Sequence, residues 1–304
     1  PRVKQTAKLL WGIYVGLVLF LTIVLKLEGF TWHQSLCHSF GTLATGGFST
    51  FDNSLLLTNY DGSLGVQAST NIMLVQWTFI VFMFIAATNF TLHYYFISKK
   101  RFDYFKDEEF KTYTFIFIAA SLTIFLNIFF SASNNSIVHN FTDSTFTTIS
   151  ILTTTGYGTV DYETWPNASK MIIFFMFFVG GTAGSTTGGI KIIRTILVLK
   201  YISYELKKLI HPKGVYNIRV GNNVLADDVV KTTLGFYLFY IFIFVFTSVV
   251  FALFGQDIVT SLTASASSIG NIGPGMGAIG PYDNWSHFPD TLKWISCFCM
   301  LLGD

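Results

Sequence analysis

Three short runs of glycine and oxygen-bearing residues have a composition and a spacing that could coordinate a cation. They read TGGFS at residues 45–49, TTGYG at residues 154–158 and NIGPG at residues 271–275. Their central glycines, Gly47, Gly156 and Gly273, are separated by 109 and 117 residues. Extended strands that meet on one axis can offer rings of carbonyl oxygens that replace the hydration shell of a small cation. Glycine leaves those carbonyls free of side-chain conflict, so the runs predict a cation filter.

The elements that position these runs must be membrane helices, because the composition excludes an ordinary soluble domain. Of 304 residues, 51% are hydrophobic and 12% are charged, whereas soluble domains carry about 25% charged residues. A helix that crosses a membrane needs about 20 mostly apolar residues. Five stretches free of formal charge suit such helices, at residues 9–25, 72–97, 112–138, 171–190 and 232–256. We expect an all-α polytopic membrane protein, since barrel strands would alternate in segments of roughly ten residues.

The distribution of charge predicts which loops face the cytoplasm. Lys and Arg gather at residues 1–8, 99–111 and 191–219, and positive loops mark the cytoplasmic side. The opposite side carries mostly acidic residues, and a surface of one sign concentrates the opposite ion. These acidic residues are Glu28, Asp52, Asp61, Asp143, Asp161, Glu163, Asp257, Asp283 and Asp290. The sequence therefore predicts an outer mouth that attracts cations.

Each glycine run follows a segment that is too short to span a membrane. Thr31 and Gln34 form a capping box that starts a helix, and this helix can continue only to about Ala44, roughly 20 Å at 1.5 Å per residue. Similar short helices are expected at residues 140–152 and 256–269. Each should enter the membrane and stop, so that its partly negative C-terminal end points toward the cation path.

The order of spanning helix, short helix, filter strand and spanning helix repeats along the chain. A repeat of this kind fixes the architecture. We divide the sequence into one pore repeat at residues 1–105, a second with a cytoplasmic linker at residues 106–222, and a third, shortened, at residues 223–304.

A second anomaly is FFVGGTAGSTTGGIK at residues 177–191, where five glycines follow an apolar stretch too short to cross the membrane. Each glycine costs about 1 kcal/mol relative to alanine inside a helix, which favours an unwound backbone halfway across. Such backbone is tolerated only where it is buried in protein or beside a watery cavity. The alternative is a helix-packing face, since Gly180, Gly184 and Gly188 have four-residue spacing. We favour a flexible loop below the filter that acts as a gate.

The remaining reactive side chains do not indicate an enzyme. Most histidines lie on outer segments or the cytoplasmic linker without ligand spacing, at positions 33, 38, 139, 211 and 287. His93, in an uncharged run, is expected to be interfacial. Cys37, Cys297 and Cys299 suit small buried side chains better than a redox role. The loop lacks the Gly-Lys-Ser/Thr ending of a phosphate-binding loop and the pattern of a nucleophile elbow. We expect no organic cofactor and no nucleic-acid partner.

Several motifs together resemble a known family. TGGFS, TTTGYGTVD, GGTAGSTTGGIK, IHPKGVYNIRVG and ASSIGNIGPGMG are similar to motifs of the Trk/Ktr/HKT cation transporter superfamily, above all its bacterial TrkH-type potassium-uptake members. The resemblance implies four helix–pore–helix repeats around one pseudo-fourfold pore, K⁺ as the transported ion and a multi-pass location in the bacterial inner membrane. It also implies a homodimer and a cytoplasmic, nucleotide-binding regulatory subunit of the TrkA type.

The resemblance also assigns roles to residues. The positions that it implies for K⁺ coordination are Thr45, Gly46, Gly47, Thr154, Thr155, Gly156, Asn271, Ile272 and Gly273. The positions that it implies for an intramembrane gating loop are Gly180, Gly181, Gly184, Ser185, Gly188 and Gly189. Two departures stand out: only three of four repeats are visible, and Asp304 stands where the family usually has a pore-lining arginine. We therefore expect a fragment, with the first repeat upstream.

Two alternatives stay open at this point. A sodium-permeable transporter, or one that couples K⁺ to Na⁺ or H⁺, would belong to the same superfamily and share the same motifs. The basic segment at residues 200–219 suits either a cytoplasmic protein partner or the anionic lipid of the membrane surface.

The gate hypothesis makes a direct prediction. Deleting residues 181–187 from the full-length protein should raise cation flux, because a shorter loop no longer lies across the path. The measurement is rubidium-86 uptake into proteoliposomes, and unchanged uptake in a correctly folded deletion variant would contradict the gate.

Overall fold

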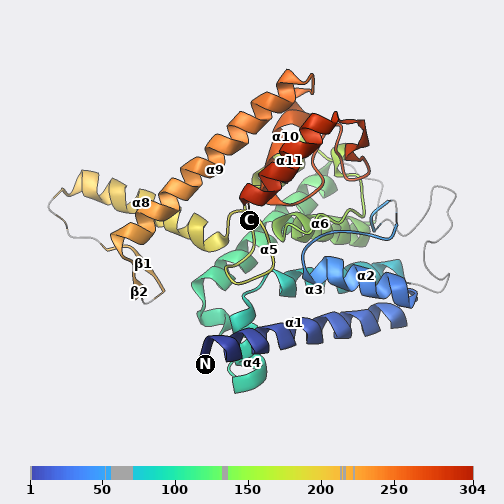
Figure 1. Cartoon of the computed structure of the whole chain (residues 1–304), viewed down its shortest axis with the longest axis horizontal. Coiled ribbons are helices and arrows are strands. Elements are labelled where there is room, and N and C mark those ends of the chain that lie inside the picture. The colour runs from blue at the N-terminus through green and yellow to red at the C-terminus, as the bar shows by residue number, and fades with distance from the viewer. Residues whose placement is uncertain are drawn as a thin grey trace.

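The computed structural model describes residues 2–51, 53–55, 71–131, 136–212, 214, 217–221 and 223–303. Three of the described helices are long and apolar enough to cross a membrane, at Ala7–Leu27, Glu108–Phe130 and Asp227–Leu253. Figure 1 shows the helices gathered into one bundle, with α8 and a small β-hairpin projecting from one side. The expected all-helical membrane architecture is confirmed.

The first part of the bundle is built from α1 (Arg2–Leu27), α2 (Trp32–Leu43), α3 (Ile72–Ala86) and α4 (Phe90–Lys99). The predicted capping box is present, because the N–H of Thr31 donates to Gln34 Oε1 at 2.9 Å and the N–H of Gln34 donates to Thr31 Oγ1 at 3.3 Å. Helix α2 has 12 residues and stops at its C-cap, Ala44. It packs against both α1 and α3, so it is held inside the bundle without crossing it.

The uncharged run at residues 72–97 is not one straight helix. Helices α3 and α4 meet at an angle of 95°, and the side chain of Asn89 caps α4 by accepting a hydrogen bond from the N–H of Thr91 at 2.8 Å. Hydropathy alone did not indicate this bend. The carbonyl of Ala87, at the bend, is one of the groups that the glycine-rich loop at residues 180–189 uses as a hydrogen-bond partner.

The middle of the chain forms a 3-10 turn η1 (Tyr104–Lys106), α5 (Glu108–Phe130), α6 (Ile137–Leu152), a second 3-10 turn η2 (Tyr162–Thr164), α7 (Asn167–Met176) and α8 (Ile192–Ile210). Helix α6 packs against α3 and α5. Between α7 and α8 the backbone is not helical, as predicted. Gly180, Gly184 and Gly188 lie outside any helix, so the alternative of a helix-packing face is wrong.

The last part contains the antiparallel strands β1 (Arg219–Val220) and β2 (Asn223–Val224), in which Arg219 is paired with Val224. It continues with α9 (Asp227–Leu253), α10 (Ile258–Gly270), a 3-10 turn η3 (Trp285–His287) and α11 (Asp290–Gly303). Helix α10 packs between α9 and α11, and the three lie together in Figure 1.

The short helices α6 and α10 are polar and yet buried. Ser265, Ser267 and Ser268 of α10 are fully buried, as are Ser144 and Thr148 of α6. Buried hydroxyl groups are costly unless they are bonded, and several find partners on neighbouring backbone, as Ser265 Oγ does with the carbonyl of Phe244 at 2.9 Å. The hydroxyl side chains thus tie the short helices to their surroundings.

The capping of α10 by Asp257 yields a prediction. The carboxylate accepts hydrogen bonds from the N–H groups of Val259 at 3.1 Å and Thr260 at 3.2 Å. Replacing a capping Asp by Ala costs about 1 kcal/mol, so Asp257→Ala should lower the thermal unfolding midpoint in detergent. Asp257→Asn, which keeps a capping oxygen, is the matched control and should retain most of the stability.

The same cap should depend on pH. The hydrogen bond with the Thr260 side chain, followed by those from the Thr260 and Val259 amides, lowers the pKa of Asp257. A lowered folded-state pKa stabilises the fold above the ordinary carboxyl pKa, and this contribution disappears as the pH falls through the lowered value. The difference in midpoint between the unaltered chain and Asp257→Ala should therefore shrink in acid. A difference that is constant with pH would contradict this account.

Candidate functional site

The three glycine runs begin where the three short helices end, and they share an unusual backbone. Their first and third residues all have positive φ. The angles are 52° at Thr45, 53° at Thr154, 54° at Asn271, 65° at Gly47, 82° at Gly156 and 107° at Gly273. A β-branched residue in this region is a true outlier, and such strain persists only where the surroundings impose it. The three runs that align in sequence therefore also share a backbone conformation at their first and third residues.

The N–H groups of each run are bonded back to the helix from which the run emerges. In every run the second and third residues donate to a helix residue five and six positions earlier, respectively. The pairs are Gly46 and Gly47 to the Gly41 carbonyl at 2.8 and 3.2 Å, Thr155 and Gly156 to the Ser150 carbonyl at 3.0 and 3.2 Å, and Ile272 and Gly273 to the carbonyl and Oγ of Ser267 at 3.0 Å each. The N–H groups of the second and third residues of each run are therefore bonded to the preceding helix, and the carbonyls of the run do not take part in these bonds.

The runs lie side by side in chain order. A Cβ atom added to Gly47 would overlap the carbonyl oxygen of Thr155, and one added to Gly156 would overlap the carbonyl oxygen of Ile272. Neither carbonyl accepts a hydrogen bond from any residue that the structure describes. A Cβ on Gly273 meets no described atom within 4 Å. Glycine is thus required at positions 47 and 156, both by the positive φ angle and by the close approach of the next run.

Tyr157 fastens the second run to the first. Its side chain is buried, and its hydroxyl donates to the carbonyl of Phe48 at 3.2 Å. The N–H of Leu55 donates to the carbonyl of Gly158 at 3.0 Å, and the N–H of Gly158 donates to Ser54 Oγ at 3.0 Å. Tyr157 and Gly158 therefore attach the second run to the first run and to the segment that follows it.

Tyr162 and Glu163 fasten the second run to the third, and sequence reasoning missed the role of both. The Tyr162 hydroxyl donates to the carbonyl of Gly275 at 2.6 Å. Glu163 Oε1 accepts a hydrogen bond from the N–H of Gly277, and burial raises the pKa of this carboxyl. No sequence pattern marked these residues, because their partners are backbone groups more than 110 residues away.

The glycine-rich loop at residues 180–189 lies against the start of all three runs. Thr45 Oγ1 donates to the carbonyl of Thr186 at 2.9 Å, and the N–H of Gly188 donates to Thr154 Oγ1 at 2.8 Å. A Cβ on Gly189 would lie 3.5 Å from the carbonyl oxygen of Gly270, next to the third run. The structure thus brings together the two sets of residues that the sequence singled out.

The loop is also bonded internally and to the bend between α3 and α4. Gly180 donates its N–H to the carbonyl of Ile190 at 2.7 Å, which closes the neck of the loop. Gly181 donates to Thr187 Oγ1 at 3.1 Å, and Ser185 Oγ donates to the carbonyl of Thr182. Thr182 donates through N–H and Oγ1 to the carbonyl of Ala87, each at 3.0 Å. Much of the unwound backbone thereby finds hydrogen-bond partners within the protein, as the membrane interior requires.

Other sequence expectations had mixed outcomes. His93 is buried within the protein, and its ring nitrogens lie 2.8 Å from the Tyr104 hydroxyl and 3.0 Å from the Ile85 carbonyl; its position at the membrane interface stays a prediction. Cys299 is buried as expected, whereas Cys297 is exposed. Asp52, Asp61 and Asp304 lie outside the described residues. Among the residues that are described, no group of three or more His, Cys, Asp or Glu could hold a metal ion.

Comparison with known proteins bears on this arrangement. A family described as "TrkH: Cation transport protein" matches residues 1–304. The chain is 36% identical over 306 residues to the Trk system potassium uptake protein TrkH of Vibrio parahaemolyticus and 31% identical over 304 residues to that of Escherichia coli K12. All of this chain is covered in both cases, but it spans about 60% of the length of these relatives.

A solved structure agrees with the sequence comparison. The crystal structure of the potassium transporter TrkH from Vibrio parahaemolyticus superimposes with a TM-score of 0.88 and 36% identity, covering 100% of this chain and 62% of that chain. The match extends over the three runs and the loop, which lie within the covered residues. With its multi-pass helical fold and its whole length matched, the chain belongs to the TrkH family of cation transport proteins.

Proposed function

We propose that this chain supplies three walls of a K⁺-conducting path and takes part in potassium uptake across the bacterial inner membrane. The observation that carries the proposal is the set of three runs with matched conformations, packed side by side, whose carbonyls at Thr155 and Ile272 accept no hydrogen bond from described residues. Oxygen atoms held in this way can replace the water around a cation. The relatives named above are potassium uptake proteins.

The K⁺ ligands in this proposal come from the first three positions of each run. They are Thr45, Gly46 and Gly47, Thr154, Thr155 and Gly156, and Asn271, Ile272 and Gly273. The short helices end beside these residues, so their C-terminal partial charges add to the attraction for a cation. Entry is favoured by the membrane potential, which contributes about 2.3 kcal/mol per charge per 100 mV.

The repeats proposed for residues 1–105, 106–222 and 223–304 place the walls in order around the path. Gly47 packs on the second run and Gly156 on the third. By the same rule a fourth run would pack against Gly273, giving the pseudo-fourfold ring. The whole transporter would be a homodimer with a cytoplasmic regulatory subunit of the TrkA type, and residues 191–219 provide its basic cytoplasmic surface.

The loop at residues 180–189 is the gate in this proposal. It touches Thr45, Thr154 and the backbone beside Gly270. The loop therefore lies at the end of the filter where the runs begin, next to the C-terminal ends of the short helices. Its five glycines and non-helical backbone give it the conformational freedom that an opening movement needs.

The filter proposal predicts the effect of Gly156→Ser. The added side chain would collide with the Ile272 carbonyl, and φ of +82° is unfavourable for serine. The full-length protein should lose its preference for rubidium-86 over sodium-22 in proteoliposome uptake. Gly235→Ser is the matched control, because a Cβ on Gly235 meets no described atom within 4 Å.

The same measurement decides between the candidate functions. A scaffold protein would show uptake that is indifferent to Gly156→Ser. A sodium-permeable or ion-coupled transporter would show comparable sodium and rubidium uptake, or uptake of one ion that requires the other, before any substitution is made.

A further inference from the structure

Two adjacent carboxylates at the start of α5 hold different parts of the molecule. The side chain of Glu109 is 7% exposed. Its Oε1 atom accepts hydrogen bonds from the N–H of Ala183 at 2.8 Å and from the N–H of Ile193 at 2.9 Å. Ala183 lies within the glycine-rich loop, whereas Ile193 lies in the first turn of α8. One oxygen atom therefore joins the loop to the helix that follows it.

This arrangement needs an acceptor of the kind that Glu109 provides. The free N–H groups at the start of a helix favour an anion, and α8 begins at Ile192. A buried carboxylate is costly unless it is hydrogen-bonded, and here both donors come from backbone that has no regular helical partner. Lys191 Nζ donates to the carbonyl and to Oγ1 of Thr187, which places a positive charge in the same region.

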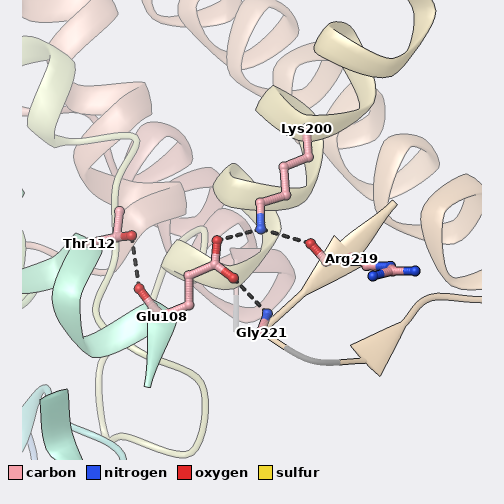
Figure 2. Close-up of polar contacts among 5 residues, drawn as sticks. All are labelled: Glu108, Thr112, Lys200, Arg219 and Gly221. Carbon is pink, nitrogen blue, oxygen red and sulfur yellow. Dashed lines mark hydrogen bonds and ion pairs between the residues drawn. The ribbon is translucent and has the colours of Figure 1, made fainter. Parts of the chain in front are cut away.

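Glu108, the preceding residue, is bonded to α8 and to the β-hairpin, as Figure 2 shows. Its Oε1 atom forms an ion pair with Lys200 Nζ from α8, and its Oε2 atom accepts a hydrogen bond from the N–H of Gly221 at 2.7 Å. Lys200 Nζ also donates to the carbonyl of Arg219 at 2.7 Å. The first turn of α5 is thereby attached to the β-hairpin formed by β1 and β2.

Glu108 and Glu109 are adjacent in the first turn of α5, so the helix backbone connects their two sets of contacts. Asp107 caps this turn by accepting a hydrogen bond from the N–H of Phe110 at 2.7 Å, and Thr112 Oγ1 donates to the carbonyl of Glu108 at 2.9 Å. A displacement of the hairpin therefore reaches the loop through a short, hydrogen-bonded path of helix.

We propose that Glu109 is a positioning residue that holds the loop against the filter, and that the Glu108–Lys200 bridge couples this hold to the cytoplasmic hairpin. The proposal rests on the gate assigned to the loop under the proposed function. It adds Glu108, Glu109 and Lys200 as the residues through which a change at the cytoplasmic hairpin can alter the position of the loop.

The first test measures rubidium-86 uptake by the full-length protein in proteoliposomes. Glu109→Ala removes both charge-assisted hydrogen bonds, so uptake should rise about tenfold. The ratio of rubidium to sodium uptake should not change, because the filter is untouched. Glu109→Gln keeps an acceptor oxygen and should restore uptake close to that of the unaltered protein. A merely structural residue would lower uptake or alter the ratio.

A second variant reaches the same bonds from the other side, in case Glu109→Ala does not fold. Ile193→Pro removes one donor, and proline is tolerated in the first turn of a helix. It should also raise uptake, by less than Glu109→Ala. Unchanged uptake in a folded variant overturns the positioning role if deletion of residues 181–187 raises uptake. Unchanged uptake in the deletion as well overturns the gate on which the proposal rests.

The coupling has its own test, in amide hydrogen exchange of the full-length protein. Lys200→Met should speed exchange across residues 181–193, because the turn of α5 loses its attachment to the hairpin. Lys207→Met, an exposed lysine of the same helix, is the matched control and should leave exchange unchanged. If Lys200→Met behaves like Lys207→Met, the coupling is overturned, and the role of Glu109 is then judged by uptake alone.

Discussion

A bare backbone inside a membrane has no water to bond with, and the whole structure is arranged around this constraint. The runs at residues 45–49, 154–158 and 271–275 satisfy it by turning their N–H groups toward the short helices from which they emerge. The carbonyls at Thr155 and Ile272 then face the neighbouring runs without a bonded donor among the described residues. In the proposed filter, these free acceptors are the atoms that would replace the water around a cation.

The same constraint explains the surroundings of the site. The glycine-rich loop is unwound, and it finds its partners in the bend of α3 and α4, in Thr154 and in Glu109. The short helices are stopped inside the bundle, and some of their buried hydroxyl groups, such as that of Ser265, bond to adjacent backbone. The glycine runs and the loop are thus connected by hydrogen bonds to one another and to neighbouring helices.

Much of this could be predicted from the sequence, because the relevant signals are local. Hydropathy located the long helices, Thr31 and Gln34 marked the start of α2, and the clustered glycines marked the unwound loop. The positive φ of Thr45 and Thr154 could not be predicted, since threonine normally avoids it and only tertiary contacts impose it. The role of Tyr162 was missed because its partner is a distant backbone group, the carbonyl of Gly275, which leaves no pattern in the neighbouring sequence. The bend at Asn89 was missed because it interrupts a continuous apolar run, so that hydropathy does not mark it.

The side-by-side packing of the runs has a consequence for how such repeats can diverge. Gly47 and Gly156 each make room for a carbonyl of the following run. A substitution at Gly47 or Gly156 would therefore displace the backbone of the neighbouring run, and a compensating change would have to arise in that run. The central glycines of the first two runs are thus constrained by their neighbours, whereas the residues that follow the central glycines, Phe48, Tyr157 and Pro274, differ from run to run.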